Sequence, residues 1–366
     1  MRRSASVDLI ESAIPMRPKP YQVGFILLPE FSYFGLIAAT QPLFLANWRA
    51  QHALFAWTTL SCDGGPVRAS NGTLVDVGAQ LGVQRGFDTL LVLASFDPKR
   101  HAGNSRLRYE LILAAARGIE VGGIETGSEA LAAAGLLDRR LAAVHWDNLD
   151  GFRERYPRVE ATDRMFHAEP GRLTCAGGTA VIDLMIHLVA REGGESLAVE
   201  VAEQMLVGRP RPPALKQLAD SGAMPDGGSE LIRAAAALMK QNPDNPLSIP
   251  EVARRLAVSP RHLRRQFREL LGTTTVRYYL RLRLVQAHNL LEQTDLSVTE
   301  IAIATGFRSL EHFSRAYAAM FGCAPSRDRH QTITAPIYRS GYRVALARSE
   351  IPRGPPRRAG RKPRRR

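Results

Sequence analysis

The turn that contains Glu125 has the composition of a small-molecule site. The segment Ile119-Glu-Val-Gly-Gly-Ile-Glu-Thr-Gly-Ser128 predicts a buried strand, a glycine turn and the first turn of a helix. In a parallel sheet, such a turn exposes one side chain at the carboxyl edge, beside free amides at a helix N-terminus. We therefore expect Glu125 and Thr126 to contact a ligand, and the carboxylate suits a cationic group. The alternative is a glutamate that only stabilises the helix dipole.

Aromatic residues could complete a site for a cation. The face of an aromatic ring attracts an ammonium group by about 0.5–2 kcal/mol. Trp146 is the first candidate, with Phe31, Tyr33 or Phe96 beside it. Packing in the core is the alternative for each ring. His145 stands alone in an apolar setting, which favours a structural role.

One pattern occurs twice in the carboxy-terminal third of the chain, over residues 248–272 and 297–322. Each copy starts with a serine that is followed three residues later by a glutamate, the arrangement of a helix capping box. A short turn and a second serine cap, Ser259 or Ser309, then lead into a second helix. We expect its apolar stripe to be Leu263, Phe267 and Leu270 in the first copy and Phe313, Tyr317 and Met320 in the second.

The second helix of the first copy carries arginines opposite that stripe, namely Arg261, Arg264, Arg265 and Arg268. A helix-turn-helix motif places such a helix in the major groove of DNA, where an arginine side chain can bind two acceptors of guanine at once. A merely solvated face is the alternative, and the duplication of the motif favours DNA. Between the copies, residues 274–291 predict one long helix that would hold both units on one duplex.

Composition and charge restrict the possible functions. The chain has 366 residues, 45% of them hydrophobic, which is enough for two or three globular domains. Up to residue 208 it has 20 basic and 23 acidic residues, whereas the remainder has 29 basic and 12 acidic residues, which indicates a polyanionic partner for the second part.

The three cysteines of the chain show neither a disulfide nor a zinc pattern, and we expect no metal or cofactor. No apolar stretch is long enough to span a membrane, so we expect a cytoplasmic protein.

Strand and helix patterns alternate over residues 21–207, which predicts a doubly wound α/β sheet with helices on both faces. Residues 208–228 concentrate proline, glycine and charge, and predict an interdomain linker. Amphipathic helices then occupy residues 229–330, an all-α domain. We expect residues 1–20 and 331–366 to be disordered arms, the second of them strongly basic.

Residues 229–329 resemble the DNA-binding domain of the AraC family of bacterial transcription regulators. The stretch Gly306-Phe-Arg-Ser-Leu-Glu-His-Phe-Ser-Arg315, with Phe321-Gly322 and Ala324-Pro325-Ser326 after it, matches the signature of that family. The resemblance implies that the side chains facing bases or phosphates are Arg261, Arg264, Arg265, Leu310, Glu311, His312, Ser314 and Arg315. It also implies promoter double-stranded DNA and RNA polymerase as partners, and a homodimer.

The first part of the chain resembles the PfpI-like branch of the class I glutamine amidotransferase superfamily, whose fold is flavodoxin-like. The resemblance is carried by the Glu125 turn, Pro42-Leu-Phe-Leu-Ala-Asn47, Ala143-Val-His145-Trp146 and the run Thr174-Cys-Ala-Gly-Gly-Thr-Ala-Val-Ile-Asp-Leu-Met185. The whole chain is similar to the GlxA-type regulators, which join this fold to an AraC-type domain. In the enzymes of the superfamily a cysteine nucleophile occupies the turn, where this chain has Glu125, so the resemblance implies a sensor.

We therefore expect a DNA-binding transcription regulator, an activator as is usual in the family, that is not an enzyme. Similar regulators respond to small nitrogen compounds such as glycine betaine, carnitine or arginine, so a cationic or zwitterionic effector is expected. One alternative is a hydrolase or lyase that uses Glu125 and His145 and carries an accessory DNA-binding module. A nonspecific nucleoid protein that depends on the basic tail is a further alternative.

Overall fold

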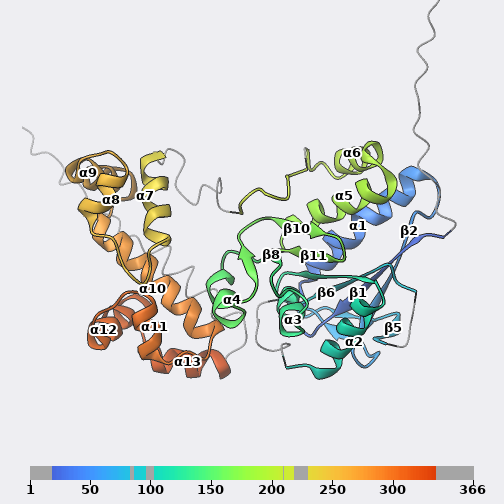
Figure 1. The fold of residues 1–366 in the computed structure, drawn as a ribbon, viewed down its shortest axis with the longest axis horizontal. Helices are drawn as coiled ribbons and strands as arrows, with labels where there is room; N and C mark the ends of the chain where they lie inside the picture. The colour runs from blue at the N-terminus through green and yellow to red at the C-terminus, as the bar shows by residue number, and fades with distance from the viewer. Residues whose placement is uncertain (1–18, 83–85, 96–102, 209, 218–229, 335–366) are drawn as a thin grey trace, which may run out of the picture. The chain divides into compact units, whose positions relative to one another are not determined.

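The computed structural model describes residues 19–82, 86–95, 103–208, 210–217 and 230–334 (Figure 1). The chain divides into two compact units, Met1–Ala219 and Asp220–Arg366, called here the first and the second unit. Most of the two arms expected at the chain ends lies outside the described residues. Among the described helices, none combines the length and the apolar character that crossing a bilayer requires.

The first unit contains a seven-stranded sheet in the order β10-β11-β7-β6-β1-β2-β5. All neighbouring strands are parallel except β10, which runs antiparallel to β11 at one edge. The chain order reverses between β1 and β6, which is the topological switch of a flavodoxin-like sheet. The strands are β1 (Tyr21–Leu27), β2 (Phe55–Ser61), β5 (Ala79–Gln80), β6 (Thr89–Leu93), β7 (Glu120–Ile124), β10 (Phe166–Glu169) and β11 (Arg172–Cys175).

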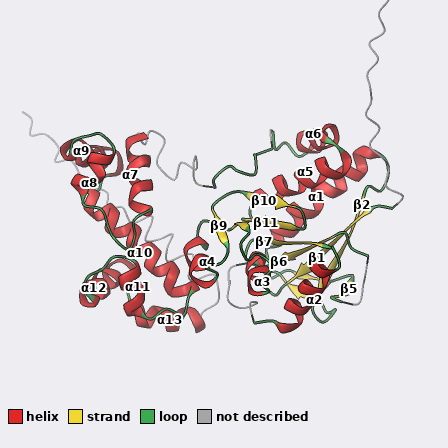
Figure 2. Ribbon diagram, in the orientation of Figure 1, coloured by secondary structure: helices red, strands yellow, loops and turns green. Residues whose placement is uncertain are grey.

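Helices cover both faces of the sheet, as the alternating pattern predicted (Figure 2). One face packs against α1 (Tyr33–Ala50), α5 (Ala180–Gly193) and α6 (Glu195–Gln204), and the other against α2 (Ser105–Ala116) and α3 (Gly127–Ala133). Alternate residues of β1 enter the two cores: Phe25 lies in the first and Ile26 in the second, and both are fully buried. Each such side chain contributes about 1.5–3 kcal/mol by leaving water.

Short elements complete the first unit. A hairpin around Asn71 and Gly72 is formed by β3 (Val67–Arg68) paired with β4 (Leu74–Val75). A two-stranded parallel sheet of β8 (Leu141–Ala143) and β9 (Glu160–Thr162), joined through α4 (Leu149–Arg155), has no clear signal in the sequence. Strands of three residues are too short for a visible alternation of apolar and polar positions.

Residues 210–217, which the sequence placed in the linker, are bound to the first unit. The main-chain N–H of Met165 donates to the carbonyl oxygen of Leu215, and the side chain of Leu215 packs against the core. We call residues 210–217 the strap. The strap ends shortly before the boundary between the two units.

The second unit is all helical and contains two helix-turn-helix motifs around one long helix. Its elements are α7 (Glu230–Lys240), α8 (Ile249–Arg255), α9 (Pro260–Leu271), α10 (Thr275–Gln293), α11 (Val298–Ala304), α12 (Leu310–Phe321) and α13 (Pro325–Thr334). We call α9 and α12 the reading helices. Residues 331–334, assigned from the sequence to the basic tail, continue α13.

The core of each motif differs in detail from the expected stripe. On α9 Leu263 and Phe267 are buried as expected, but Leu270 is 38% exposed and Leu271 packs against the core instead. At about 100° per residue, Leu270 and Leu271 lie on opposite sides of Phe267, and at this end of the helix the core lies on the side of Leu271. On α12 the expected Phe313, Tyr317 and Met320 all contact the core, and Phe321 joins them.

The capping expected at the start of each motif is complete in the second copy only. The Ser297 hydroxyl accepts from the Glu300 N–H, and the Glu300 carboxylate accepts from the Ser297 N–H, so both amides are satisfied. In the first copy the Ser248 hydroxyl accepts from Glu251 N–H, but the Glu251 carboxylate binds two arginines of its own helix, Arg254 and Arg255. The prediction of a capping box was therefore wrong for the first copy.

Candidate ligand site and nucleic-acid interface

Glu125 lies at the carboxyl edge of the sheet, directly after β7 and before α3. Its φ of 56° is in the left-handed region, which a non-glycine residue adopts only where the surroundings impose it. The turn is tight because a Cβ on Gly127 would overlap the carbonyl oxygen of Val92 in β6. The strand, the turn and the helix thus hold the Glu125 backbone in one position.

The Glu125 carboxylate is bound by groups from three other segments. It accepts hydrogen bonds from the Ser32 and Ser95 hydroxyls and from the main-chain N–H of Gly178. Ser32 follows β1 and Ser95 follows β6, so both flank the topological switch. Burial raises the pKa of the Glu125 carboxyl above its ordinary value, and the three hydrogen bonds oppose that rise. The side chain remains half-buried, and Gly177 is required beside it because any Cβ there would overlap it.

The thiols of the first unit are poor nucleophiles. Cys175 is fully buried, and burial raises its pKa to about 12, with the Glu125 and Asp183 charges adding to the rise. Burial also raises the pKa of Cys62, which lies on the other side of the sheet near α2. Neither thiol occupies the turn. Among the described residues, no group of histidine, cysteine and acidic side chains has the arrangement of a metal site.

The other expected ligand residues differ in accessibility. Trp146 and Tyr33 are half-buried, so each can present part of its ring to a ligand. Phe31 is fully buried in the core, which favours core packing over ligand contact. Thr126 is buried, and its hydroxyl oxygen has no hydrogen-bond partner among the described residues. Phe96 lies outside the described residues.

His145 has the surroundings of a structural side chain. Its Nδ1 accepts from the main-chain N–H of Asp147 at 3.2 Å, and its ring lies 5.3 Å from that of Trp146. Burial lowers the pKa of the His145 imidazole below its ordinary value, which favours the neutral form. These contacts lie within its own loop.

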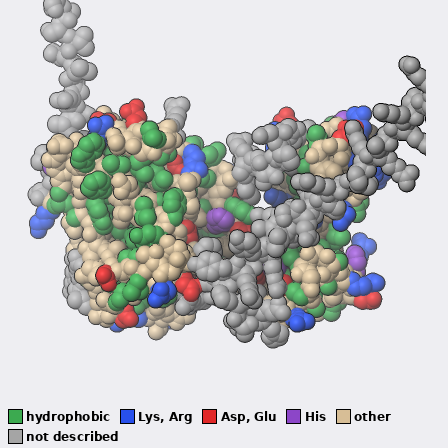
Figure 3. All heavy atoms as spheres, turned by 180° about the vertical axis from the view of Figure 1, so that it is seen from behind, with side chains coloured by type: hydrophobic (Ala, Val, Ile, Leu, Met, Phe, Trp, Pro, Cys, Tyr) green, Lys and Arg blue, Asp and Glu red, His purple; other side chains and the backbone are tan. Residues whose placement is uncertain are grey.

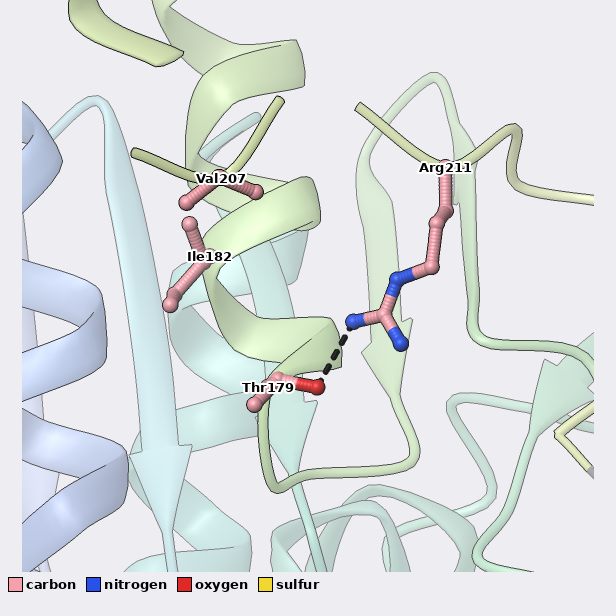
Figure 4. Close-up of a pocket in the computed structure, with 4 residues that line it drawn as sticks. All are labelled: Thr179, Ile182, Val207 and Arg211. Carbon is pink, nitrogen blue, oxygen red and sulfur yellow. Dashed lines mark hydrogen bonds between the residues drawn. The ribbon is translucent and has the colours of Figure 1, made fainter. Parts of the chain in front are cut away.

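Sequence reasoning missed a pocket beside the start of α5. It is lined by Thr179, Ile182, Val207 and Arg211, and has a volume of about 360 Å³ (Figure 4). Arg211 belongs to the strap and donates to the Thr179 hydroxyl at 2.8 Å. No sequence signal marked Arg211, because it lies in a proline-rich stretch without periodicity. Thr179, which lines this pocket, directly follows Gly178, whose main-chain N–H binds the Glu125 carboxylate, so the pocket begins beside the Glu125 turn.

The reading helix α9 presents its arginines to solvent. Arg261, Arg264 and Arg265 are exposed, as is Arg268 on the same helix, while Leu263 and Phe267 are buried beneath them. The Ser259 hydroxyl caps the helix by accepting from the His262 N–H. Four arginines and one glutamate leave this helix strongly cationic.

The reading helix α12 is exposed at the expected positions but carries little net charge. Ser309 caps it, and its exposed residues include Leu310, Glu311, His312 and Arg315, whereas Ser314 is half-buried. Arg315 is 73% exposed and lies 3.5 Å from Glu311, so the one arginine is partly neutralised. The expectation missed the exposed Arg308, which comes just before the cap and is visible in the sequence as a basic residue in the turn.

Comparisons with known proteins agree with this organisation. A family model described as a helix-turn-helix domain matches residues 252–331. The chain is 42% identical over 305 residues to the HTH-type transcriptional regulator CdhR of Pseudomonas aeruginosa, across 83% of this chain and 90% of that protein. It is 33% identical over 311 residues to the HTH-type transcriptional regulator GlxA of Rhizobium meliloti, across 85% of this chain and 96% of that protein.

A solved structure is also similar to the chain. The crystal structure of an AraC family transcriptional regulator from Pseudomonas putida covers 51% of this chain and 100% of its own, with 30% identity and a TM-score of 0.47. The two curated relatives match over both units of the chain, beyond the reading helices alone. The chain is therefore a DNA-binding transcription regulator, and it belongs to the GlxA-type regulators of the AraC family.

Proposed function

We propose that this regulator activates transcription when a small cationic or zwitterionic nitrogen metabolite, such as glycine betaine, carnitine or arginine, binds to its first unit. The observation that carries the proposal is the position of the Glu125 carboxylate. It lies at the topological switch of a doubly wound sheet, where such folds bind their ligands. A half-buried carboxylate attracts a cation more strongly than an exposed one, because less water screens the charges.

Trp146 and Tyr33 are the aromatic residues available to the same ligand. Both are half-buried, and the face of either ring could cover a quaternary ammonium group. Thr126 offers a buried hydroxyl without a partner in the described structure. Phe31 is left out of this proposed site because it is fully buried.

Both reading helices would enter successive major grooves of promoter DNA. Their exposed faces support this proposal, because the residues expected to reach bases or phosphates are accessible on α9 and α12. In the proposed mode, Arg261, Arg264 and Arg265 act on the first half-site. Leu310, Glu311, His312, Ser314 and Arg315 act on the second. The bound regulator would then recruit RNA polymerase.

A homodimer through the first unit forms part of the proposal. Apolar side chains gather over much of the visible face of this unit, at the left of Figure 3. Four apolar side chains of α1 are about half exposed: Phe34, Ile37, Phe44 and Trp48. They recur at steps of three, seven and four residues, so they form one stripe along the helix. An exposed apolar stripe of this kind supports association with a second copy.

The test measures ligand binding and DNA binding with the same purified protein. We expect glycine betaine, carnitine or arginine to raise the melting temperature without being consumed, and to increase the recovery of specific genomic fragments. Glu125→Gln should abolish the ligand effect, whereas Glu203→Gln, an exposed glutamate on α6, should leave it intact. Ligand affinity should fall as the pH is lowered through the Glu125 pKa, because protonation removes the charge that attracts the cation.

Two results would contradict the proposal. If Glu125→Gln responded to the metabolites like the unmodified chain, the site would be elsewhere. If the purified protein consumed an amide, an α-oxoaldehyde or an isocyanide, and lost that activity in Glu125→Gln, the first unit would be an enzyme.

A further inference from the structure

The strap is fastened at its start by a buried carboxylate. The main-chain N–H of Arg211 donates to Asp183 Oδ1 at 2.9 Å, and its guanidinium donates to Oδ2 through Nε at 2.9 Å and Nη2 at 2.6 Å. The Asp183 side chain is fully buried at the start of α5. Hydrogen bonds between an arginine and a carboxylate are charge-assisted, which makes them stronger than those between neutral groups.

Gln217 fastens the end of the strap through both its side chain and its main chain. The Gln217 side-chain amide donates to the carbonyl oxygens of Val144 and Arg164, each at 2.8 Å, and accepts from the main-chain N–H of Trp146 at 2.9 Å. The Gln217 main-chain N–H donates to the Asp163 carbonyl oxygen. Both ends of the strap therefore bind next to the sensing site, one at Thr179 and the other at Trp146.

The pocket of Figure 4 exists only while the strap is bound. Ile182 and Val207 form an apolar wall on one side, and the Arg211 guanidinium of the strap lies across from them. Nε and Nη2 of Arg211 are engaged by Asp183 and Thr179, while Nη1 has no acceptor among the described residues. The Arg211 side chain lines the pocket and is 36% exposed, so a ligand can reach the guanidinium.

We infer that this pocket binds the carboxylate of a small molecule that also carries a compact branched group, and that Arg211 recognises that carboxylate. The inference deepens the proposed sensing function and rests on it. An unused guanidinium donor attracts a carboxylate oxygen, and the apolar wall fits a tert-butyl or trimethylammonium group. Zwitterionic metabolites such as glycine betaine have this composition.

Binding in the pocket stabilises the docked strap. Arg211 forms one side of the pocket, so a ligand held there binds the docked strap and not the detached one. A ligand that binds one of two states shifts the equilibrium toward that state. The strap is the last described part of the first unit before the second begins. The ligand therefore determines in what fraction of the molecules the chain stays bound to the first unit up to residue 217.

Lysyl endopeptidase gives a direct readout of strap docking. The chain has five lysines, and Lys216 lies within the strap. The main chain on both sides of the Lys216–Gln217 bond is hydrogen-bonded while the strap is docked, so cleavage requires its release. When release is fast relative to cutting, the cleavage rate follows the detached fraction. At ten times its Kd, a ligand of the docked form should slow cleavage at Lys216 about tenfold.

Three probes separate the chemical groups that the pocket could recognise. Glycine betaine and 3,3-dimethylbutanoate have the same shape and carboxylate, but only the first carries a positive charge. Choline keeps the trimethylammonium group and has no carboxylate. We expect the two carboxylates to slow cleavage at Lys216 and choline to have no effect on it.

Two variants assign the effect to the guanidinium. Arg211→Gln should speed the basal cleavage and abolish protection by 3,3-dimethylbutanoate. Asp183→Asn weakens the fastening but keeps the guanidinium, so it should speed the basal cleavage and retain the protection. Arg49→Gln removes an exposed arginine that pairs with Glu200 elsewhere in the unit, and should change neither rate. Circular dichroism of each variant checks the fold.

The inference is overturned if 3,3-dimethylbutanoate leaves the cleavage rate of the unmodified chain unchanged, if choline protects as well as glycine betaine, or if Arg211→Gln keeps the protection. The proposed function fails separately. It fails if glycine betaine, carnitine and arginine change neither the melting temperature nor DNA binding, even where 3,3-dimethylbutanoate protects Lys216. Conversely, an effect of glycine betaine on DNA binding without protection of Lys216 leaves the sensing function and removes only this inference.

Discussion

The two helix-turn-helix motifs share one backbone plan and differ in what they present to DNA. In both, a serine caps the second helix and aromatic side chains hold it against the long helix α10. The surfaces diverge, since α9 carries four arginines and one glutamate, whereas α12 carries one arginine and one glutamate. The two motifs therefore share the positions that cap and bury the second helix. They differ at the exposed positions that would contact DNA.

The interiors of the two motifs diverge as well. The α9 side packs through apolar contacts, such as the Phe267 ring 5.1 Å from the Tyr278 ring. At the equivalent place α12 has Tyr317, whose hydroxyl donates to Asp328 on α13 at 2.9 Å and lies 2.7 Å from His288 Nδ1 on α10. The second motif thus contains a buried network of ionisable side chains, whereas the Tyr279 hydroxyl in the core of the first bonds only to main-chain groups of Asn242 and Leu247.

Replacement of His288 by leucine should destabilise the second motif strongly and leave the first motif little changed. His288 is 1% exposed and forms ion pairs with Glu292 at 3.3 Å and with Asp328 at 3.5 Å. Its loss leaves two carboxylates without their cation, which typically costs about 3–5 kcal/mol. Hydrogen exchange of the α12 amides, followed by mass spectrometry, should become ~100-fold faster or more.

Tyr278→Leu is the matched change in the first motif. It removes an aromatic contact and leaves no buried charge unpaired. The free energy of opening, measured by hydrogen exchange of the α9 amides, should therefore fall by about 2 kcal/mol or less. If His288→Leu and Tyr278→Leu accelerated hydrogen exchange in their motifs equally, the polar network would stabilise the second motif no more than the aromatic contact stabilises the first.

The stability of the two motifs should also differ in its pH dependence. Burial opposes the charge of His288, but hydrogen bonds and charges of Asp328 and Glu292 prevail and raise its pKa from 6.5 to about 9. The groups that face it are Glu292 on α10, Tyr317 on α12 and Asp328 on α13. A raised pKa stabilises the fold fully below pH 6.5, and this stabilisation is lost as the pH rises through 9.

The expected loss between pH 6.5 and 10 is roughly 3 kcal/mol for the second motif. Proton exchange of the α12 amides, corrected for intrinsic rates, should report it, and the imidazole resonances of His288 should titrate near pH 9. The α9 amides serve as the internal reference. A His288 midpoint near 6.5 would show that the network does not hold a charged imidazole.

The sequence was sufficient for features that depend on neighbouring residues. The Glu125 turn follows from a buried strand, glycines and a helix start in one continuous stretch, and the structure places it at the sheet edge. The reading helices follow from serine caps and apolar periodicity. Arg254 and Arg255, three and four residues after Glu251, also stood in the sequence as competitors for its carboxylate, so the incomplete capping box had a local signal too.

Features that depend on distant residues could not be predicted. Ser32 and Ser95 meet Glu125 only because β1, β6 and β7 are adjacent in the sheet. Arg211 reaches Asp183 across 28 positions, from a proline-rich stretch that carries no period. Such pairings are set by tertiary packing, which a local pattern does not contain.

Arginine substitutions on the two reading helices should separate charge from sequence preference. Arg264→Gln with Arg268→Gln should weaken binding to all DNA sequences and lower the salt dependence of log K by about 0.9 for each phosphate that is no longer neutralised. Arg315→Gln should cost roughly 1–3 kcal/mol mainly at the preferred site. Fluorescence anisotropy with specific and unrelated duplexes at several salt concentrations measures both effects.

Arg49→Gln, in the first unit, is the charge-matched control for these titrations. A uniform reduction of affinity for all duplexes from Arg315→Gln would assign that side chain to the phosphate backbone. Equal salt slopes for all three variants would mean that α9 does not contact phosphates, and the proposed division between the motifs would be wrong.

The smallest effect concerns the glutamates that begin the two motifs. Glu300→Ala removes a carboxylate that accepts from the Ser297 N–H at 2.6 Å, so we expect the free energy of unfolding to fall by about 0.5–1 kcal/mol. Glu251→Ala removes only exposed contacts with Arg254 and Arg255, which contribute little, so its effect should be smaller. In calorimetry of the full chain, Glu300→Ala should lower the Tm of the second unit by about 2–6 °C. A greater decrease from Glu251→Ala would mean that the arginine pair, rather than the reciprocal cap, holds the start of a motif.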